Sequence, residues 1–190
     1  MEGMKEFPDK FFDLAIVDPE YGIGISKNPF RQKHTKKNWD SQPPDQTYFK
    51  ELFRVAKNQI IWGGNYFGLP ATQGFLIWDK QQPEDFSSSM CEFAWSSIQS
   101  PAKIFRYWVV MDKNKIHPTQ KPIELYKWLL SKYAKPNDKI LDTHVGSGSS
   151  IIACLDMGFD VWGFELDKDY YDASMKRINN FLAQQDLFRT

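Results

Sequence analysis

Short apolar runs alternate with longer amphipathic stretches along the chain, and this alternation predicts the order of the elements. Apolar residues that recur every three or four positions predict helices over 46–57 and 122–133. Polar residues interrupt the apolar runs at 92–95 and 103–110, which favours antiparallel or edge strands there. Short apolar runs bounded by turn-forming residues predict buried strands at 12–18, 59–62, 75–78 and 139–142.

The last third of the chain follows the order strand, glycine turn, helix, strand, helix. The strand at 139–142 leads into the turn 146–148, a helix over 149–157, a strand over 161–166 and a final helix over about 169–184. A strand, a turn, a helix and a second strand form a βαβ unit, which is typical of parallel sheets with helices on both faces. The predicted fold class is therefore α/β, with a mostly parallel sheet and antiparallel edge strands.

Acidic residues stand at the carboxyl ends of three predicted strands, namely Asp18, Asp142 and Glu165. Ligands of parallel sheets bind beyond this edge, so folding could gather all three in one cleft. The turn Gly146-Ser147-Gly148 lets the backbone approach a ligand closely, because no Cβ obstructs it. Glu165 can accept hydrogen bonds from both hydroxyls of a ribose, as acids at this place do in dinucleotide folds. Together these features predict a nucleoside-containing cofactor.

The turn differs from those that bind pyrophosphate. Position 151 is Ile, so the third glycine of the Gly-x-Gly-x-x-Gly pattern is missing. That pattern brings a pyrophosphate to a helix N-terminus, so its absence weakens a nicotinamide or flavin interpretation. S-adenosylmethionine has no phosphate and needs a ribose acceptor together with acidic partners for its charged methionine end. Asp142 and Glu165 suit these needs, so S-adenosyl-L-methionine is the predicted cofactor.

The tetrapeptide Asp18-Pro19-Glu20-Tyr21 closes the first predicted strand. It suits methyl transfer to an exocyclic amino group, whose lone pair is delocalised into the base and is a poor nucleophile. The Asp18 carboxylate and the Pro19 carbonyl can each accept one N–H, which would hold the nitrogen in line with a sulfonium methyl group. Tyr21 can stack on a base flipped out of double-stranded DNA. Taken alone, the tetrapeptide is equally consistent with a strand-ending turn and a packed tyrosine.

Composition changes this picture little. At 190 residues the chain is expected to form one domain. Its 24 basic and 24 acidic residues cancel, so net charge gives no argument for nucleic-acid binding, although the basic cluster 27–37 is a candidate phosphate contact. The two cysteines lack metal-ligand spacing, and no apolar stretch matches a membrane span. We therefore expect no metal site, no membrane association and a cytoplasmic location.

Together these motifs resemble the beta-class DNA amino methyltransferases, of the small kind often carried by phages and mobile elements. That family places an Asp-Pro-Pro-Tyr catalytic motif before its cofactor motif, a circularly permuted order that is also seen here. The hexapeptide 117–122, His-Pro-Thr-Gln-Lys-Pro, resembles the family's signature before the cofactor strand. The matching segments span nearly the whole chain: 14–21, 60–67, 75–80, 117–122, 141–149 and 163–165.

The resemblance implies a Rossmann-like methyltransferase sheet, S-adenosylmethionine as donor and DNA as partner. It also implies that Thr119, Gln120 and Lys121 line the pocket for the methionine end of the cofactor. His144 stands where the family usually has phenylalanine, and an imidazole can still stack on a ring. Asp18 favours adenine-N6 methylation, because many cytosine-N4 relatives have serine there. Cytosine-N4 methylation by the same geometry, and a catalytically impaired remnant that binds DNA or cofactor, are the alternatives.

The chain departs from this family's pattern in two further places. Glu20 replaces the usual second proline, which adds a negative charge beside the target site. Family members usually carry an Asn-Gly-Asp-Cys-like strand before the catalytic segment, and this chain begins after that point. We therefore expect a sheet that could lack its first strand, with an exposed edge that a second copy could cover in a homodimer. Residues 81–116 are the predicted target-recognition insertion.

Overall fold

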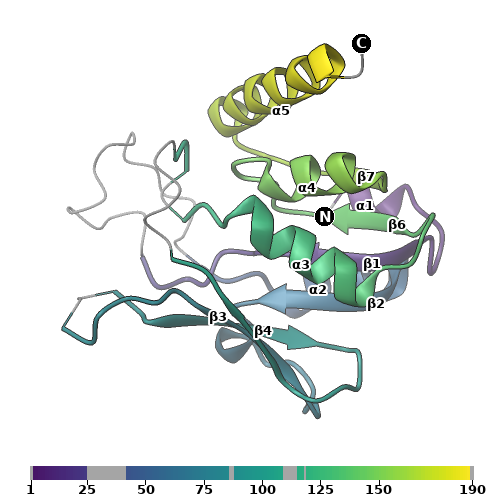
Figure 1. Ribbon diagram of the computed structural model, residues 1–190. Helices are drawn as coiled ribbons and strands as arrows, with labels where there is room; N and C mark the ends of the chain where they lie inside the picture. Colours follow the sequence, from purple (N-terminus) through teal and green to yellow (C-terminus); the bar gives the residue numbers. More distant parts are fainter. Residues whose placement is uncertain (1, 25–41, 86–87, 109–114, 118, 189–190) are drawn as a thin grey trace.

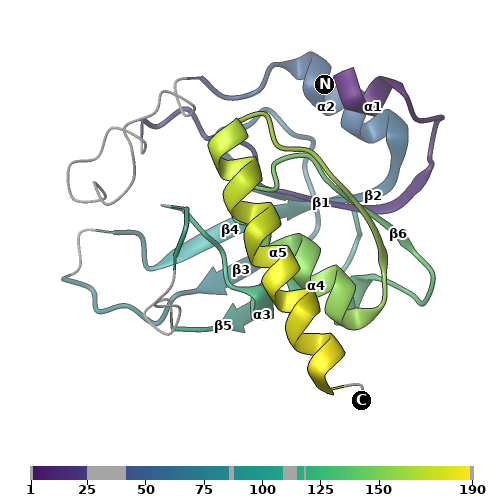
Figure 2. The same cartoon turned by 90° about the horizontal axis from the view of Figure 1, so that it is seen from above.

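The computed structural model describes residues 2–24, 42–85, 88–108, 115–117 and 119–188. Within these residues seven strands form one sheet, in the order β5-β3-β4-β2-β1-β6-β7 (Figures 1 and 2). The strands are β1 (Phe12–Val17), β2 (Ala56–Trp62), β3 (Phe75–Asp79), β4 (Cys91–Ser96), β5 (Lys103–Arg106), β6 (Lys139–Asp142) and β7 (Asp160–Gly163). The helices are α1 (Glu2–Lys5), α2 (Gln46–Val55), the 3-10 helix η3 (Gly64–Tyr66), α3 (Ile123–Tyr133), α4 (Ser149–Met157) and α5 (Lys168–Phe188).

All described strands except β4 run in one direction. β1 pairs in parallel with β2 and β6, β6 with β7, and β3 with β5. β4 runs antiparallel to both of its neighbours, β2 and β3. The mostly parallel α/β sheet is thus confirmed, and the two segments expected to be antiparallel or edge strands form the antiparallel β4 and the edge strand β5, although antiparallel pairing and edge position fall on different strands. The described residues of the connection from β3 to β4 contain no helix. A short connection without a crossover helix joins antiparallel strands.

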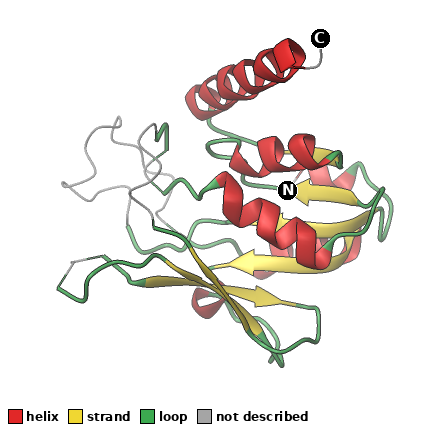
Figure 3. Ribbon diagram, viewed as in Figure 1, coloured by secondary structure: helices red, strands yellow, loops and turns green. Residues whose placement is uncertain are grey.

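Helices cover both faces of the sheet (Figures 1 and 3). The central strand β1 is buried on both faces, because Leu14 and Ile16 join an apolar cluster with α3 and α4, whereas Ala15 and Val17 join another with α2. Leu125 of α3 is fully buried in the first cluster. Burial of one such side chain contributes about 1.5–3 kcal/mol, so these two clusters hold the sheet and its helices together.

Local sequence explains most helix ends. Asp45 caps α2 by accepting a hydrogen bond from the Tyr48 N–H, and Pro122 occupies the position before α3. Gly148 and Gly158 flank α4, both with φ of 76°, a conformation that glycine adopts without steric cost. The observed bounds of α4 are those predicted. The short elements α1 and η3 were not predicted, because three or four residues carry no periodic signal.

Some predicted segments end differently or lie outside the described residues. β7 ends at Gly163, so Glu165 lies in the following loop instead of the strand. β5 ends at Arg106, and residues 109–110 of that predicted strand lie outside the described residues, as does the whole basic cluster at 27–37. β7 pairs with β6 alone among the described strands, so it forms one edge of the sheet. A second copy covering this edge in a homodimer stays a prediction.

Residues 81–116, the predicted target-recognition insertion, contribute β4 and β5 to this same sheet. Lys103 and Arg106 of β5 are exposed, which leaves positive charge at the sheet edge. The recognition role of the segment stays a prediction. None of the described helices is long and apolar enough to cross a membrane.

Candidate active site

A cavity of about 700 Å³ opens where the parallel strands end. β1 and β6 are adjacent and parallel, with Ala15 paired to Leu141, so the segments that follow them leave the sheet side by side. The cavity is lined both by Asp18 after β1 and by Gly146 after β6, which confirms that the two motifs meet in one pocket. Of the predicted site residues, those that line the cavity are Asp18, Pro19, Tyr21, Thr119, Gln120, Lys121, His144, Gly146 and Glu165.

On the glycine-turn side of the cavity, which we call the cofactor half (Val145–Ser147 and Phe164–Asp167), backbone N–H groups hold a carboxylate. The Gly146 N–H donates to Glu165 Oε2 at 2.8 Å, and the Asp167 N–H donates to Glu165 Oε1 at 2.8 Å. Gly146 has a φ of 52°, and an added Cβ would come no closer than 3.9 Å to its neighbours. The carboxylate of Glu165 is thus fixed at the wall of the cavity with lone pairs left to accept hydroxyl groups.

Asp142 and Gly148 do not line the cavity, contrary to expectation. Asp142 is 1% exposed, and its oxygens accept hydrogen bonds from the His144 N–H, at 2.9 Å, and from the Ser150 hydroxyl. Burial raises the pKa of Asp142 to about 6. A Cβ on Gly148 would lie 3.3 Å from Ser174 and Ile178, so this glycine lets α5 pack against the turn. Both residues support the turn from behind.

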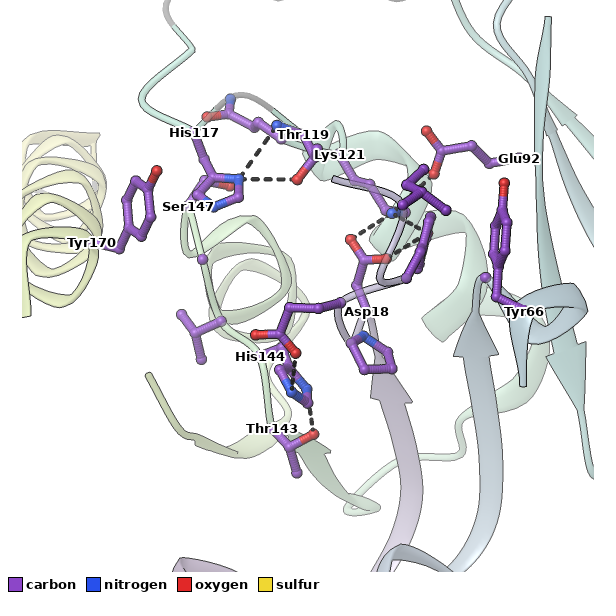
Figure 4. A pocket seen from close by; sticks show the side chains of 18 of the residues that line it. Asp18, Tyr66, Glu92, His117, Thr119, Lys121, Thr143, His144, Ser147 and Tyr170 are labelled. Atoms are coloured by element: carbon purple, nitrogen blue, oxygen red, sulfur yellow. Dashed lines mark hydrogen bonds and ion pairs between the residues drawn. The ribbon is translucent and has the colours of Figure 1, made fainter. Parts of the chain in front are cut away.

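The opposite side of the cavity, which we call the target half, is built around Asp18. Its Oδ1 accepts a hydrogen bond from the Tyr21 hydroxyl at 2.8 Å, and its Oδ2 accepts one from Lys121 Nζ at 2.5 Å. Lys121 is 3% exposed and lies between Asp18 and Glu92, whose Oε2 is 3.0 Å from Nζ (Figure 4). The resemblance had implied that Lys121 lines the methionine pocket, whereas the structure places its ammonium group on Asp18.

Two further charged residues that the sequence did not single out complete this cluster. Glu92 Oε1 accepts from Lys80 Nζ at 2.8 Å, so two carboxylates and two ammonium groups alternate through the target half. Burial alone would raise the pKa of Glu92, but Lys121 and Lys80 hold the pKa well below its usual range. Burial alone would lower the pKa of Lys121, but Asp18 and Glu92 raise it. Glu92 and Lys121 are therefore charged at neutral pH.

Strand direction explains why Glu92 and Lys80 reach this edge. Lys80 directly follows β3, so it stands at the carboxyl end of a parallel strand. Glu92 is the second residue of β4, and because β4 is reversed its beginning lies at the same edge. No periodic or motif signal marks these two positions, since their meeting depends on the strand order.

Tyr21 packs differently from the prediction that it stacks on a base. Its ring stacks on Tyr66, with centroids 5.0 Å apart and planes 17° apart. The close approach depends on Gly63, where a Cβ would lie 2.2 Å from the Tyr21 ring. Burial, followed by the charges of Asp18 and Glu92, raises the pKa of Tyr21 far above its usual value, so the phenol stays a donor to Asp18. Tyr66 is 46% exposed and lines the cavity.

The remaining predicted residues connect the two halves. Thr119 Oγ1 lies 3.1 Å from His117 Nδ1, and the His117 ring packs against Tyr170 of α5 with centroids 4.3 Å apart. The Gln120 Oε1 accepts from the Ile116 N–H at 3.1 Å, so this side chain secures the loop as well as lining the cavity. His144 Nδ1 lies 2.9 Å from Thr143 Oγ1.

The geometry combines two chemical capacities in one cavity. The cofactor half can hold a nucleoside by its ribose hydroxyls, with backbone in close approach at Gly146. The target half offers the Asp18 carboxylate and the carbonyl of Pro19 as acceptors for an amino group. A group bound to the turn and an amine bound at Asp18 would therefore share this cavity.

Comparison with known proteins agrees with this geometry. Residues 25–176 match a family model described as DNA methylase, of the N6/N4 methyltransferases. The chain is 37% identical to "Putative methylase YubD" from Escherichia coli K12, covering 92% of this chain and 85% of that protein. The chain belongs to the N6/N4 DNA methylase family, which confirms the resemblance seen in the sequence.

Solved structures show the same fold at low sequence identity. The M1.HpyAVI–SAM complex superposes with a TM-score of 0.61 at 19% identity, covering 92% of each chain. The cytosine-N4-specific PvuII DNA methyltransferase superposes with a TM-score of 0.61 at 13% identity, covering 94% of this chain and 86% of that one. These similarities support the Rossmann-like methyltransferase sheet predicted from the motifs.

Proposed function

We propose that the chain transfers a methyl group from S-adenosyl-L-methionine to the N6 amino group of adenine in double-stranded DNA, acting in the cytoplasm. The observation that carries this proposal is that Asp18 and the Gly146–Glu165 cradle open into one cavity. Family membership supports DNA methylation, and the related M1.HpyAVI structure holds the same cofactor. Asp18 favours adenine over cytosine, because it stands where many cytosine-N4 enzymes have serine.

In this proposal the cofactor half binds the donor. Glu165 accepts hydrogen bonds from the ribose hydroxyls, and the turn at Gly146 lets the adenosine approach the backbone. Thr119, Gln120 and His144 line the cavity, and Thr119 and Gln120 are proposed to lie at the methionine end of the cofactor. When bound, the cofactor supplies an electrophilic methyl group on a positively charged sulfur.

The target half then positions the amine. Asp18 and the Pro19 carbonyl accept the two N–H groups, which orients the nitrogen lone pair toward the methyl group and stabilises the positive charge that develops on nitrogen. Lys121 keeps Asp18 in place through a buried ion pair at 2.5 Å. The stacked rings of Tyr21 and Tyr66, which both line the cavity, are proposed to contact the flipped base. Lys103 and Arg106 on β5 are proposed to contact DNA phosphates in the recognition segment.

The test is transfer of labelled methyl groups into duplex DNA by the wild type, Asp18→Ala and, as a matched control, Asp172→Ala on the exposed start of α5. We expect Asp18→Ala to lower the rate by about 100- to 1,000-fold, the range found when a transition-state hydrogen-bond partner is removed. Asp172→Ala should keep the wild-type rate. Equal rates in Asp18→Ala and the wild type would contradict the proposal.

Digestion of the labelled DNA to nucleosides then decides between bases. N6-methyladenine is the expected product, and N4-methylcytosine would replace the proposed specificity with its alternative. Cofactor binding without any transfer to a broad set of duplexes would favour a catalytically impaired remnant.

A further inference from the structure

The two side chains at which the chain departs from the family pattern contact each other. Glu20 Oε2 lies 3.4 Å from His144 Nε2, although the residues are far apart in the sequence. The His144 ring is itself fixed, because its Nδ1 contacts Thr143 Oγ1 at 2.9 Å and the Thr143 hydroxyl contacts the Tyr48 hydroxyl at 2.6 Å. The Glu20 carboxylate is therefore held in one place at the wall of the cavity.

That place lies between the two halves of the cavity. Glu20 follows Pro19 in the segment that bears Asp18, whereas His144 directly precedes Val145, where the cofactor half begins. Glu20 and His144 both line the cavity. Their contact therefore joins the segment of the amine site at Asp18 to the segment of the turn, and the Glu20 carboxylate lies where the two halves meet. A methyl group passing from the turn to Asp18 must cross this region.

The Glu20 carboxylate carries a negative charge there at neutral pH. Burial by itself would raise the pKa of Glu20, but the contact with His144 outweighs it, and the pKa lies below its ordinary value. His117 also faces this charge and acts in the same direction. The Glu20 side chain is 30% exposed, so solvent screens the charge in part and its effect on a ligand is moderate.

We propose that Glu20, held by His144, is a specificity residue that makes the site prefer S-adenosylmethionine over its demethylated product, S-adenosylhomocysteine. The proposal rests on the proposed function, since it requires the cofactor to bind with its sulfur between the turn and Asp18. The donor and the product differ at sulfur by one methyl group and one positive charge. A carboxylate near sulfur attracts the charged sulfonium and gains nothing from the neutral thioether, so it favours exchange of product for donor.

Isothermal titration of both ligands, without DNA, tests this at pH 8, where an ordinary imidazole carries no charge. We expect Glu20→Gln to lower the ratio Kd(S-adenosylhomocysteine)/Kd(S-adenosylmethionine) about tenfold, equivalent to about 1.4 kcal/mol. The loss should fall on S-adenosylmethionine alone. Glu20→Asp keeps the charge and should retain most of the wild-type ratio.

Glu165→Gln is the matched control within the same cavity. It also removes one carboxylate charge, but at the ribose, which is the same in both ligands, so affinity for both should fall and their ratio should stay constant. An unchanged ratio in Glu20→Gln, with both ligands bound by the wild type, would overturn the inference and leave the proposed function intact. If the wild type bound neither ligand, both proposals would fail. Thermal unfolding of each variant is the control for the fold. With an unchanged melting temperature, a lower ratio of the two Kd values reflects the lost charge.

Discussion

In the cofactor half of the cavity backbone N–H groups hold one carboxylate, whereas in the target half charged side chains hold one another. The defining contact of the first half joins Gly146 to Glu165, 19 positions apart. The defining contact of the second joins Asp18 to Lys121, 103 positions apart. The first half is the product of one βαβ unit, while the second needs strands from most of the sheet. A short stretch of sequence can thus form the backbone turn of a binding site, whereas a cluster of paired charges requires strands from most of the sheet.

The two halves should also respond differently to substitution. The target half contains buried opposite charges, and removal of one leaves another uncompensated, so its variants should lose stability as well as activity. The cofactor half holds one carboxylate by backbone N–H groups, so its variants should lose affinity with smaller changes in stability. Four substitutions, given in order of decreasing expected effect, test whether the two halves differ in this way.

The largest effect is expected for Lys121→Met, which leaves Asp18 and Glu92 without their shared cation. Breaking a buried ion pair typically costs about 3–5 kcal/mol of unfolding free energy. Lys127→Met is the matched control on α3, because Lys127 pairs with Asp156 at the surface with 37% of its side chain exposed. Surface pairs contribute about 0–1 kcal/mol. Urea denaturation at pH 7 measures both, and similar losses would refute the role given to buried charge.

The next effect concerns Asp142→Asn, behind the turn. Its pKa of about 6, raised from 3.8 by burial, gives stability that is full at low pH and is lost as pH rises through about 6. At 1.36 kcal/mol per pKa unit, the wild type should lose roughly 3 kcal/mol between pH 4 and pH 8 relative to the variant. Unfolding free energies of both proteins across this range provide the measurement. Parallel pH profiles would show that Asp142 is not buried in its charged form.

Glu165→Gln should weaken cofactor binding more than stability. A glutamine can accept only through its single oxygen, so one of the backbone N–H groups from Gly146 and Asp167 faces an amide NH₂. The ribose hydroxyls then also lose a charged acceptor. Loss of a hydrogen bond to a charged group costs about 1.5–3 kcal/mol, so the Kd for S-adenosylmethionine should rise about 10- to 100-fold. Glu124→Gln, in the first turn of α3 and outside the cavity, is the control for calorimetry. Equal Kd values for both variants would exclude Glu165 from the site.

The smallest effect separates the cost of backbone strain from the cost of filling the cofactor half. Gly146 and Gly158 have φ of 52° and 76°, and an added Cβ at either meets no atom closer than 3.9 Å. Gly146→Ala and Gly158→Ala should therefore destabilise similarly, by about 1–2 kcal/mol. Only Gly146→Ala places a methyl group at the cavity wall, so it alone should weaken cofactor binding. Equal binding by both variants would place the ligand elsewhere.

Residue type and local order were enough to predict the cofactor half. The strand, turn and helix around Gly146–Gly148 follow from contiguous patterns, and the bounds of α4 were those expected. Asp142 was predicted to contact the ligand but does not line the cavity, and an acid at a strand end looks the same in sequence whether it faces a cavity or the turn behind it. Its burial against Ser150 decides between these roles.

The target half was predicted only at its motif. Asp18 and Tyr21 were recognised, but their partners Lys121, Glu92 and Tyr66 were either placed elsewhere or not singled out. The same holds for the contact between Glu20 and His144, which appeared in the sequence as two separate departures. Each of these contacts joins segments whose distance along the chain carries no signal.

Local sequence was enough to predict the longer helices and strands, the α/β class, the family and the two motifs. Periodicity, turn residues and motif spacing all act within short stretches of the chain. Tertiary structure alone decided which charges meet. The reversed strand β4 lies between β2 and β3. This order brings Glu92 to the edge of the sheet where β1 ends and Asp18 follows it. Ion pairing depends on distances of a few ångströms, and strand order, which local sequence does not specify, sets those distances.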